Sequence, residues 1–307
     1  MRKRGADRVE RAGLWRSMLR YRQHYVMLLP FFAIFAVFTI WPVVMSVVLS
    51  FTSYNVFQTP QFVGWRNYID LFVNDDVFPT ALRNTLVFSL FTGPMGFLLS
   101  MFLAWVINEL PRGVRELMTL VFYAPSIAGN AFAVWLLIFD GDIYGYLNSF
   151  LLRLGMISEP IVWLKDTRYM MAAVIAVQLW VSLGTSFLTM RAGFSTVDRS
   201  LIEAGLTDGI RNRFQELWYI TLPAMTPHLI LSVILSITGS FGAETAITVM
   251  TGFPSTGYAT HTIMHHLRDH GFLRFQRGYA CAISVVLFVL CLTFDRLAQA
   301  LVKRVGE

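Results

Sequence analysis

Four of the six histidines lie within ten residues, between positions 261 and 270. His261, His265 and Asp269 recur at every fourth position and would share one face of a helix. Imidazole and carboxylate groups at this spacing can bind a metal ion. A polar helix in a loop that meets another protein has the same pattern, and we favour this second interpretation. The sequence therefore predicts no metal site.

The other sequence features give little support for catalysis. Glu244 is an isolated acid in an apolar stretch, and it has no second acid nearby with which to share general acid–base chemistry. The sequence also lacks the G-x-x-x-x-G-K-[ST] loop that cradles the phosphates of ATP. We expect no catalytic residues and no cofactor bound by this chain, so a membrane-embedded enzyme is the less favoured class.

Several polar and aromatic side chains interrupt otherwise apolar runs. Hydrogen-bonding groups and flat aromatic faces are what a sugar needs from its binding site. Polar groups in apolar helices also serve as hydrogen bonds between helices, and this alternative stays open for each residue. The candidates for a substrate pathway are Asn130, Gln178, Trp180, Ser236, Thr238 and Glu244.

The elements that must position these residues are membrane spans. The chain has 307 residues, of which 55% are hydrophobic and only 14% are charged. A soluble domain usually has about a quarter charged residues, so an ordinary soluble enzyme is excluded. Charge-poor runs of about 20 residues are long enough to cross a bilayer as helices. The sequence predicts an all-α membrane protein with six spans, at about 26–51, 84–108, 117–139, 169–190, 221–244 and 278–298.

The net charge of +6 indicates how these spans are oriented. With the N-terminus inside, the inside segments hold 17 of the 25 Lys and Arg residues and the outside segments hold 8. This asymmetry follows the positive-inside rule, so both termini are expected in the cytoplasm. The expected organisation is a basic tail (1–25), a six-span domain (26–302) and a short tail (303–307). Orientation accounts for the basic residues, and no nucleic-acid partner is predicted.

The inside segment 195–223, which precedes the fifth span, is long and polar. Ser200 and Glu203 fit a capping box, and Gly209 suits the left-handed position that ends a helix. A second short helix is expected over 211–219, and Pro223 is tolerated in the first turn that follows. The sequence predicts a helix–turn–helix elbow, which is either a docking element or a pair of interfacial helices without a partner.

The elbow resembles the EAA loop in permease subunits of binding-protein-dependent ABC importers. In that family Glu-Ala-Ala is followed by three residues and Gly, then by about nine residues and Ile-x-Leu-Pro. This sequence departs from the pattern in having Gly for the third residue and a gap of ten residues. The residues that carry the resemblance are Glu203, Ala204, Gly205, Leu206, Gly209, Ile220, Leu222 and Pro223.

The resemblance extends over nearly the whole chain and is strongest to the carbohydrate branch, which includes maltose, multiple-sugar and glycerol-phosphate permeases. The segments LLPFFAIFAVFTIWPVV, FVGWRNYIDLF and RFQRGYACAISVVLF are similar to the corresponding segments of sugar permeases. The resemblance implies a type I ABC importer permease fold in a bacterial inner membrane. A polyol or glycerol phosphate remains an alternative substrate to a sugar, and a scaffold with a docking elbow is less favoured.

The resemblance also implies partners. They are a second homologous permease subunit, two ATPase subunits that use ATP and Mg, an extracytoplasmic solute-binding protein and the lipid bilayer. Glu203 is then expected to contact the ATPase, unless it only caps its own helix. Leu201, Ile202 and Leu206 would fill a groove of that partner or lie against the membrane.

Overall fold

A computed structural model describes residues 21–129 and 131–303 of the chain. This part is helical, apart from loops and one isolated antiparallel bridge between Thr52 and Phe62. Long apolar runs become helices because only a helix satisfies its own backbone hydrogen bonds in lipid. The first helices are α2 (Arg22–Phe35), the π-helical η1 (Ala36–Ile40), α3 (Trp41–Leu49), α4 (Arg66–Ile69), the π-helical η2 (Asp70–Asn74) and α5 (Phe78–Asn108).

The remaining helices form two groups along the chain. The middle group consists of α6 (Arg112–Ile127), α7 (Phe132–Ile138), α8 (Tyr146–Arg153), α9 (Met170–Val181) and α10 (Thr185–Thr196). The last group consists of α11 (Arg199–Thr207), α12 (Arg213–Glu216), η3 (Leu217–Thr221), α13 (Leu222–Ala224), α14 (Thr226–Phe241), α15 (Thr245–Thr251), η4 (Thr256–Tyr258), α16 (Ile263–Arg268), η5 (Asp269–Leu273) and α17 (Arg277–Lys303).

The described residues contain between four and six candidate membrane spans. Four continuous stretches are long and apolar enough, namely Arg22–Leu49, Phe78–Asn108, Thr226–Thr251 and Arg277–Lys303. The predicted spans 117–139 and 169–190 correspond instead to helix pairs, α6 with α7 and α9 with α10. Their axes turn by 89° and 40°, so each pair is a broken span or a re-entrant segment.

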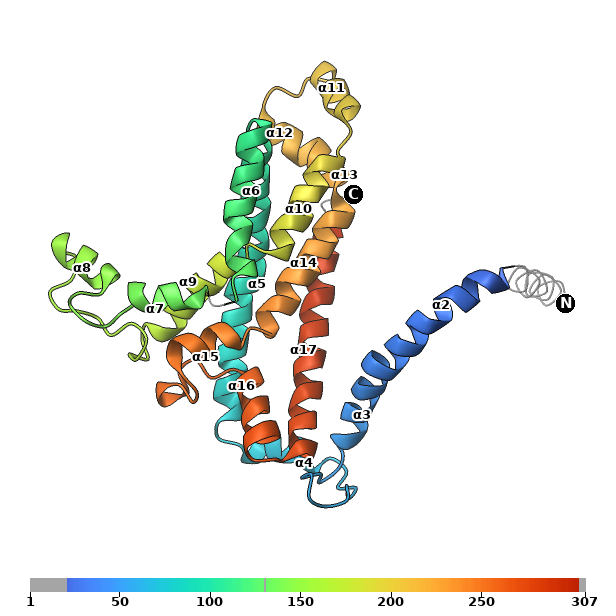
Figure 1. Ribbon diagram of the computed structural model, residues 1–307, viewed down its shortest axis with the longest axis vertical. Helices are drawn as coiled ribbons and strands as arrows, with labels where there is room; N and C mark the ends of the chain where they lie inside the picture. Colours follow the sequence, from blue (N-terminus) through green and yellow to red (C-terminus); the bar gives the residue numbers. More distant parts are fainter. Residues whose placement is uncertain (1–20, 130, 304–307) are drawn as a thin grey trace.

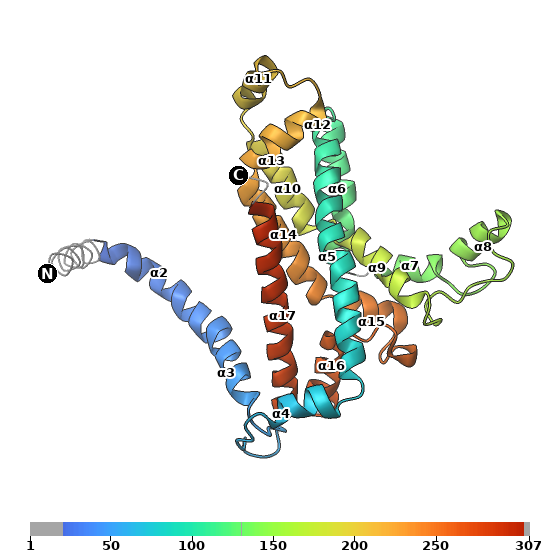
Figure 2. The same cartoon turned by 180° about the vertical axis from the view of Figure 1, so that it is seen from behind.

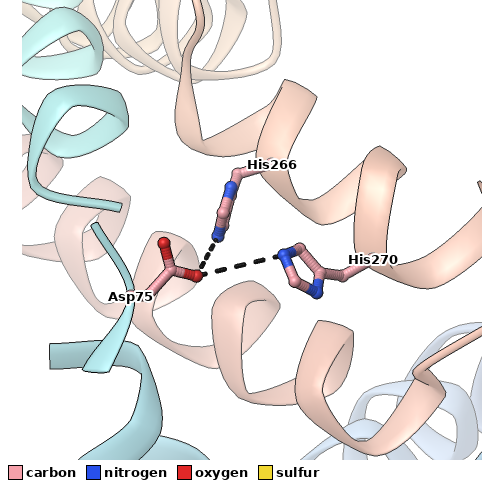
Figure 3. Close-up of side chains that lie close together, drawn as sticks. All are labelled: Asp75, His266 and His270. Carbon is pink, nitrogen blue, oxygen red and sulfur yellow. Dashed lines mark hydrogen bonds and ion pairs between the residues drawn. The ribbon is translucent and has the colours of Figure 1, made fainter. Parts of the chain in front are cut away.

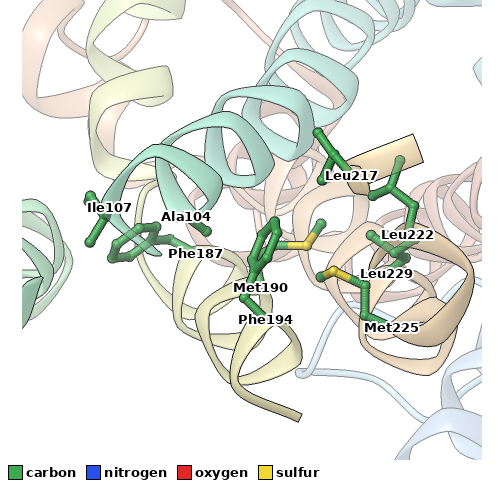
Figure 4. Packing of buried hydrophobic residues seen from close by; sticks show 9 residues of the cluster. All are labelled: Ala104, Ile107, Phe187, Met190, Phe194, Leu217, Leu222, Met225 and Leu229. Atoms are coloured by element: carbon green, nitrogen blue, oxygen red, sulfur yellow. The ribbon is translucent and has the colours of Figure 1, made fainter. Parts of the chain in front are cut away.

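Helices α5, α10, α14 and α17 form the central bundle, and Figures 1 and 2 show them running side by side. The largest apolar cluster lies between α5, α10 and the segment that leads into α14 (Figure 4). Its buried members are Ala104, Ile107, Phe187, Met190, Phe194, Leu217, Leu222, Met225 and Leu229.

Small residues let the helices of the bundle approach closely. A methyl group added at Gly96 would lie 2.9 Å from the Ser182 hydroxyl, at the end of α9. The hydroxyls of Ser186 on α10 and Ser232 on α14 are hydrogen-bonded, and Ser236 adds a hydrogen bond of 2.9 Å to Ser186. Small and hydroxylated residues at helix contacts are typical of membrane bundles.

The first span stands apart from the bundle. Every residue from Tyr21 to Val44 is exposed, although most are apolar. Helix α3 contacts α17, whereas α2 points away from the rest of the molecule (Figures 1 and 2). An apolar helix with this exposure needs lipid or another subunit around it.

The loops gather at opposite ends of the bundle. Helices α11 and α12 lie at the end drawn at the top of Figure 1, and α4 and α16 lie at the other end. Helices α7, α8, α9 and α15 project to one side between these ends (Figures 1 and 2). The predicted elbow and the histidine-rich segment are therefore far apart.

Candidate functional site

The elbow begins with a helix cap that differs from the predicted one. The prediction that Ser200 caps this helix through a box with Glu203 is wrong. The cap is Asp198, whose carboxylate accepts a 2.9 Å hydrogen bond from the backbone N–H of Ser200. This bond and a second one from the Ser200 hydroxyl lower the pKa of Asp198. Helix α11 therefore starts two residues earlier than predicted, at Arg199.

Glu203 is free of the capping role and faces solvent. Its carboxylate lies 3.3 Å from the guanidinium of Arg199, one turn earlier, and its side chain is 67% exposed. An exposed pair of this kind contributes little to stability. Glu203 is therefore available to a partner at the end of the molecule.

Gly209 ends the helix as predicted. Its φ is +98°, a conformation that side chains rarely adopt. The N–H of Ile210 donates to the carbonyl of Gly205 at 3.0 Å, and the N–H of Gly209 donates to that of Leu206 at 3.4 Å. This pair of bonds is the Schellman motif, which satisfies the last carbonyls of a helix.

The two halves of the motif meet in space. Gly205 is buried, and a methyl group added there would collide with the end of the Ile220 side chain. Helix α12 begins at Arg213 rather than 211, because the Asn212 side chain caps it by accepting from the N–H of Gln215 at 2.8 Å. The chain then continues helically through η3 to Thr221.

The end of the motif is anchored in the bundle. Leu222 is buried in the apolar cluster of Figure 4, together with Leu217 and Met225. Pro223 lies in the first turn of α13, as predicted, where its missing N–H costs little. Ile220, which lies against Gly205, and Leu222 thus connect α11 to the helices around α14.

The outer surface of the elbow is apolar as well as acidic. Leu201 and Leu206 on α11 are about half exposed, at 49% and 58%. Ile202 is partly buried, and Ala204 is exposed. The neighbouring segment adds the exposed aromatic side chains of Phe214, Trp218 and Tyr219.

Two of the predicted pathway residues share a cavity between the helices. Gln178 and Ser236 line a space of about 270 Å³, which is small for a sugar unless the helices move apart. Hydroxyl groups dominate the rest of its lining, from Thr92, Tyr123, Ser126, Ser182, Thr185, Ser186 and Ser240.

The other pathway candidates lie elsewhere. Trp180 packs edge-on against Trp135, with ring centroids 5.5 Å apart, and lies outside that lining. Glu244 pairs with Arg268 at 2.7 Å. Asn130 lies outside the residues that the structure describes.

Thr238 contacts Asp295, a buried acid that was not among the predicted residues. Its hydroxyl lies 3.3 Å from a carboxylate oxygen of Asp295 on α17, which is 8% exposed. The predicted sixth span ends at 298, which placed Asp295 near the inner surface. The single acid in a run of apolar residues was the available signal.

The histidine-rich segment is buried at the opposite end of the bundle. The predicted grouping of His261, His265 and Asp269 is not the one that forms. His265 instead contacts Thr248 at 3.1 Å and Thr262 at 2.8 Å. Burial lowers the pKa of His261 to about 4 and that of His265 to about 3.

A different trio of groups comes together there, namely Asp75, His266 and His270 (Figure 3). Asp75 follows η2, and the two histidines lie one turn apart in α16 and η5. The ring nitrogen Nε2 of His266 lies 2.8 Å from Oδ2 of Asp75, and that of His270 lies 3.9 Å away. The hydroxyl of Tyr279 donates to the same oxygen at 2.7 Å.

The chain matches known proteins over most of its length. Residues 94–307 match the family described as the binding-protein-dependent transport system inner membrane component. The chain is 31% identical over 272 residues to the probable ABC transporter permease protein YesP of Bacillus subtilis, covering 87% of this chain and 85% of that protein.

Two further relatives carry more specific names. Identity is 27% over 275 residues to the sn-glycerol-3-phosphate permease protein UgpA of Agrobacterium fabrum, covering 87% of this chain and 89% of UgpA. It is 27% over 291 residues to the arabinooligosaccharide permease protein AraP of Bacillus subtilis, covering 94% and 91%.

The fold is also found in a solved structure. A chain from the crystal structure of a bacterial alginate ABC transporter, in complex with its alginate pentasaccharide-bound periplasmic protein, superposes with a TM-score of 0.77. The identity is 22%, and the match covers 96% of this chain and 98% of that one. With the match to the family, this establishes the expected ABC permease fold. The chain belongs to the family of inner membrane components of binding-protein-dependent transport systems and is a multi-pass protein of the inner membrane.

Proposed function

We propose that this chain is one of two permease subunits in an ATP-driven importer for a carbohydrate, and that the elbow couples it to an ATPase. The observation that carries the coupling role is the elbow itself. It presents Glu203, Leu201 and Leu206 to solvent, while Ile220 and Leu222 connect it to the bundle. A partner that binds this surface can move the helices around α14.

The proposed topology has six spans and cytoplasmic termini. Each bent helix pair then counts as one span, which places α11 and α12 on the inner side. Residues 1–25 and 303–307 are cytoplasmic tails, and 26–302 form the permease domain. The distribution of Lys and Arg supports this orientation.

The proposed substrate is a sugar or an oligosaccharide. Relatives are named for sn-glycerol-3-phosphate, for sulfoquinovosyl glycerol and for arabinooligosaccharides, and these three solutes have hydroxyl groups in common. Hydroxyl-rich surroundings of Gln178 and Ser236 suit such a solute. Asn130, Trp180, Thr238 and Glu244 remain predicted pathway residues. A polyol or glycerol phosphate is the alternative substrate.

The remaining components follow from this role. A second permease would complete the pathway, two ATPase subunits would hydrolyse ATP with Mg, and a solute-binding protein would deliver the substrate from outside. Alternating access then requires the two permeases to rock against each other as the ATPases close.

Copurification tests the coupling role. Glu203→Ala combined with Gly209→Pro removes the acid and distorts the end of α11, so the ATPase should be lost from the purified complex. Glu116→Ala is the matched control, because this acid is equally exposed at 67% and pairs with Arg112 one turn earlier. The control should keep the ATPase. Retention of the ATPase and of its activity in the double variant would refute the assignment.

A further inference from the structure

We propose that Asp75, His266 and His270 form a binding site for a divalent transition-metal ion, with Zn²⁺ as the best fit. The three ligand atoms lie within 4.8 Å of one another (Figure 3). Three ligands at the usual 2.0–2.2 Å from a tetrahedral Zn²⁺ stand about 3.4 Å apart. The observed separations from Asp75 Oδ2, 2.8 Å to His266 and 3.9 Å to His270, bracket this value.

The ring of His270 already has the orientation of a metal ligand. Its Nδ1 lies 2.6 Å from the side-chain oxygen Oε1 of Gln276. An amide oxygen only accepts hydrogen bonds, so the proton of the neutral ring is on Nδ1 and the lone pair of Nε2 faces Asp75. Metal-binding histidines are commonly oriented by such a bond from the other ring nitrogen.

Asp75 is held in place by a separate contact. Its second oxygen, Oδ1, accepts hydrogen bonds of 2.9 Å from the backbone N–H groups of Val77 and Phe78 at the start of α5. Oδ2 is thereby directed at the two histidines. In the metal-free chain, the Nε2–H of His266 donates to it; on metal binding this ring would carry its proton on Nδ1 instead.

The surroundings favour a cation. The trio lines a cavity of about 610 Å³ that gives an ion access from the surface. Four carboxylates line this cavity, those of Asp70, Asp75, Asp76 and Asp269, against the two guanidinium groups of Arg66 and Arg274. The excess of two negative charges attracts a divalent ion.

His261 is a second indication that this cavity binds a ligand. His261 lines it, is 3% exposed, and both its ring nitrogens lack hydrogen-bond partners among the described residues. Its ring lies 5.7 Å from that of His266, between centroids. A water molecule bound to the metal ion would have this group as a neighbour.

The ligand set argues for zinc rather than magnesium or calcium. Two imidazoles and one carboxylate suit Zn²⁺, whereas Mg²⁺ and Ca²⁺ prefer oxygen ligands. Three protein ligands leave one position for water. The ion would join the loop after the first span to the segment before the last, at the end of the bundle opposite the elbow (Figure 1).

Zinc binding to the full-length chain tests the proposal. The chain is purified from membranes in detergent with a tag that lacks histidine, stripped with a chelator and titrated with Zn²⁺ against a chromophoric competitor. We expect one tight site. His266→Gln combined with His270→Gln should abolish it, Asp75→Asn should weaken it, and Gln276→Leu should weaken it about 10- to 100-fold.

Two variants control for the loss of any histidine. His265→Gln removes a buried neighbour that contacts Thr248 and Thr262 rather than the trio, and His24→Gln removes an exposed one. Both should bind Zn²⁺ like the unchanged chain. If Co²⁺ substitution gives the visible spectrum of a tetrahedral site in the unchanged chain and in both controls, but not in the His266→Gln and His270→Gln double variant, the ligand set is supported. If the unchanged chain binds no more Zn²⁺ than the double variant, the trio is only a hydrogen-bonded cluster and the proposal is overturned.

Discussion

Replacing Gly209 by Ala should loosen the elbow without touching another side chain. The φ of +98° is unfavourable for any residue with a Cβ, while the space around this position is open among the described residues. The cost is therefore conformational and should be about 1–2 kcal/mol. A loss of stability of this size raises the population in which α11 is locally unfolded roughly 5- to 30-fold.

Hydrogen exchange of the amides in α11 measures this opening directly. In Gly209→Ala these amides should exchange faster by that factor, while the amides of α14 should keep their rate. Gly113→Ala is the matched control, because Gly113 lies in α6 with equally open space and an ordinary helical φ. Alanine favours a helix, so in this control the amides of α11 should exchange at the rate of the unchanged chain, and those of α6 at the same rate or more slowly.

Equal exchange rates in both variants would refute the reasoning. That outcome would mean that the left-handed conformation of Gly209 does not hold the end of α11. Gly209→Asn offers a further check, because Asn tolerates positive φ better than Ala does. The exchange rate of α11 in this variant should lie between the rates of the unchanged chain and of Gly209→Ala.

Two other substitutions test the packing and the cap. Gly278→Ala should destabilise the chain by about 1–3 kcal/mol, because the new methyl group would collide with the backbone carbonyl of Thr52; thermal unfolding in detergent measures this, with Gly129→Ala, which has open space among the described residues, as the control. Asp198→Ala should speed the exchange of α11 at neutral pH. Because the folded-state pKa of Asp198 is lowered, the cap is fully present above about pH 4 and is lost as the pH falls through that lowered pKa, so the difference between variant and unchanged chain should disappear in acid. A difference that persists in acid would contradict the capping role.

The sequence was most informative where one local property determines the structure. Charge-poor apolar runs predicted the long helices because the bilayer imposes their length. Gly209 predicted the end of α11 because only glycine readily adopts positive φ. The bends in two predicted spans escaped the pattern, since an apolar run has the same composition whether it is straight or broken.

The errors arose where two residues compete or where distant segments meet. Ser200 and Asp198 are both good caps, and the structure uses Asp198, whose carboxylate accepts from the N–H of Ser200. Helical spacing grouped His261 with His265, but the approach of the loop at Asp75 decided which histidines form a cluster. Periodicity within one helix carries no information about a residue 191 positions away in the chain.

The contact between the elbow and an ATPase is the central claim, and site-directed crosslinking tests it most directly. Leu206→Cys places a thiol on the exposed surface of α11, in a background where Cys281 and Cys291 are replaced by serine. A photoreactive maleimide on this thiol should give an adduct of the permease with the ATP-hydrolysing subunit. Tyr144 is 87% exposed and lies on a loop that is predicted to be outside, so Tyr144→Cys should give no such adduct. Labelling of Leu206→Cys from outside intact cells, or the absence of an ATPase adduct, would contradict the account.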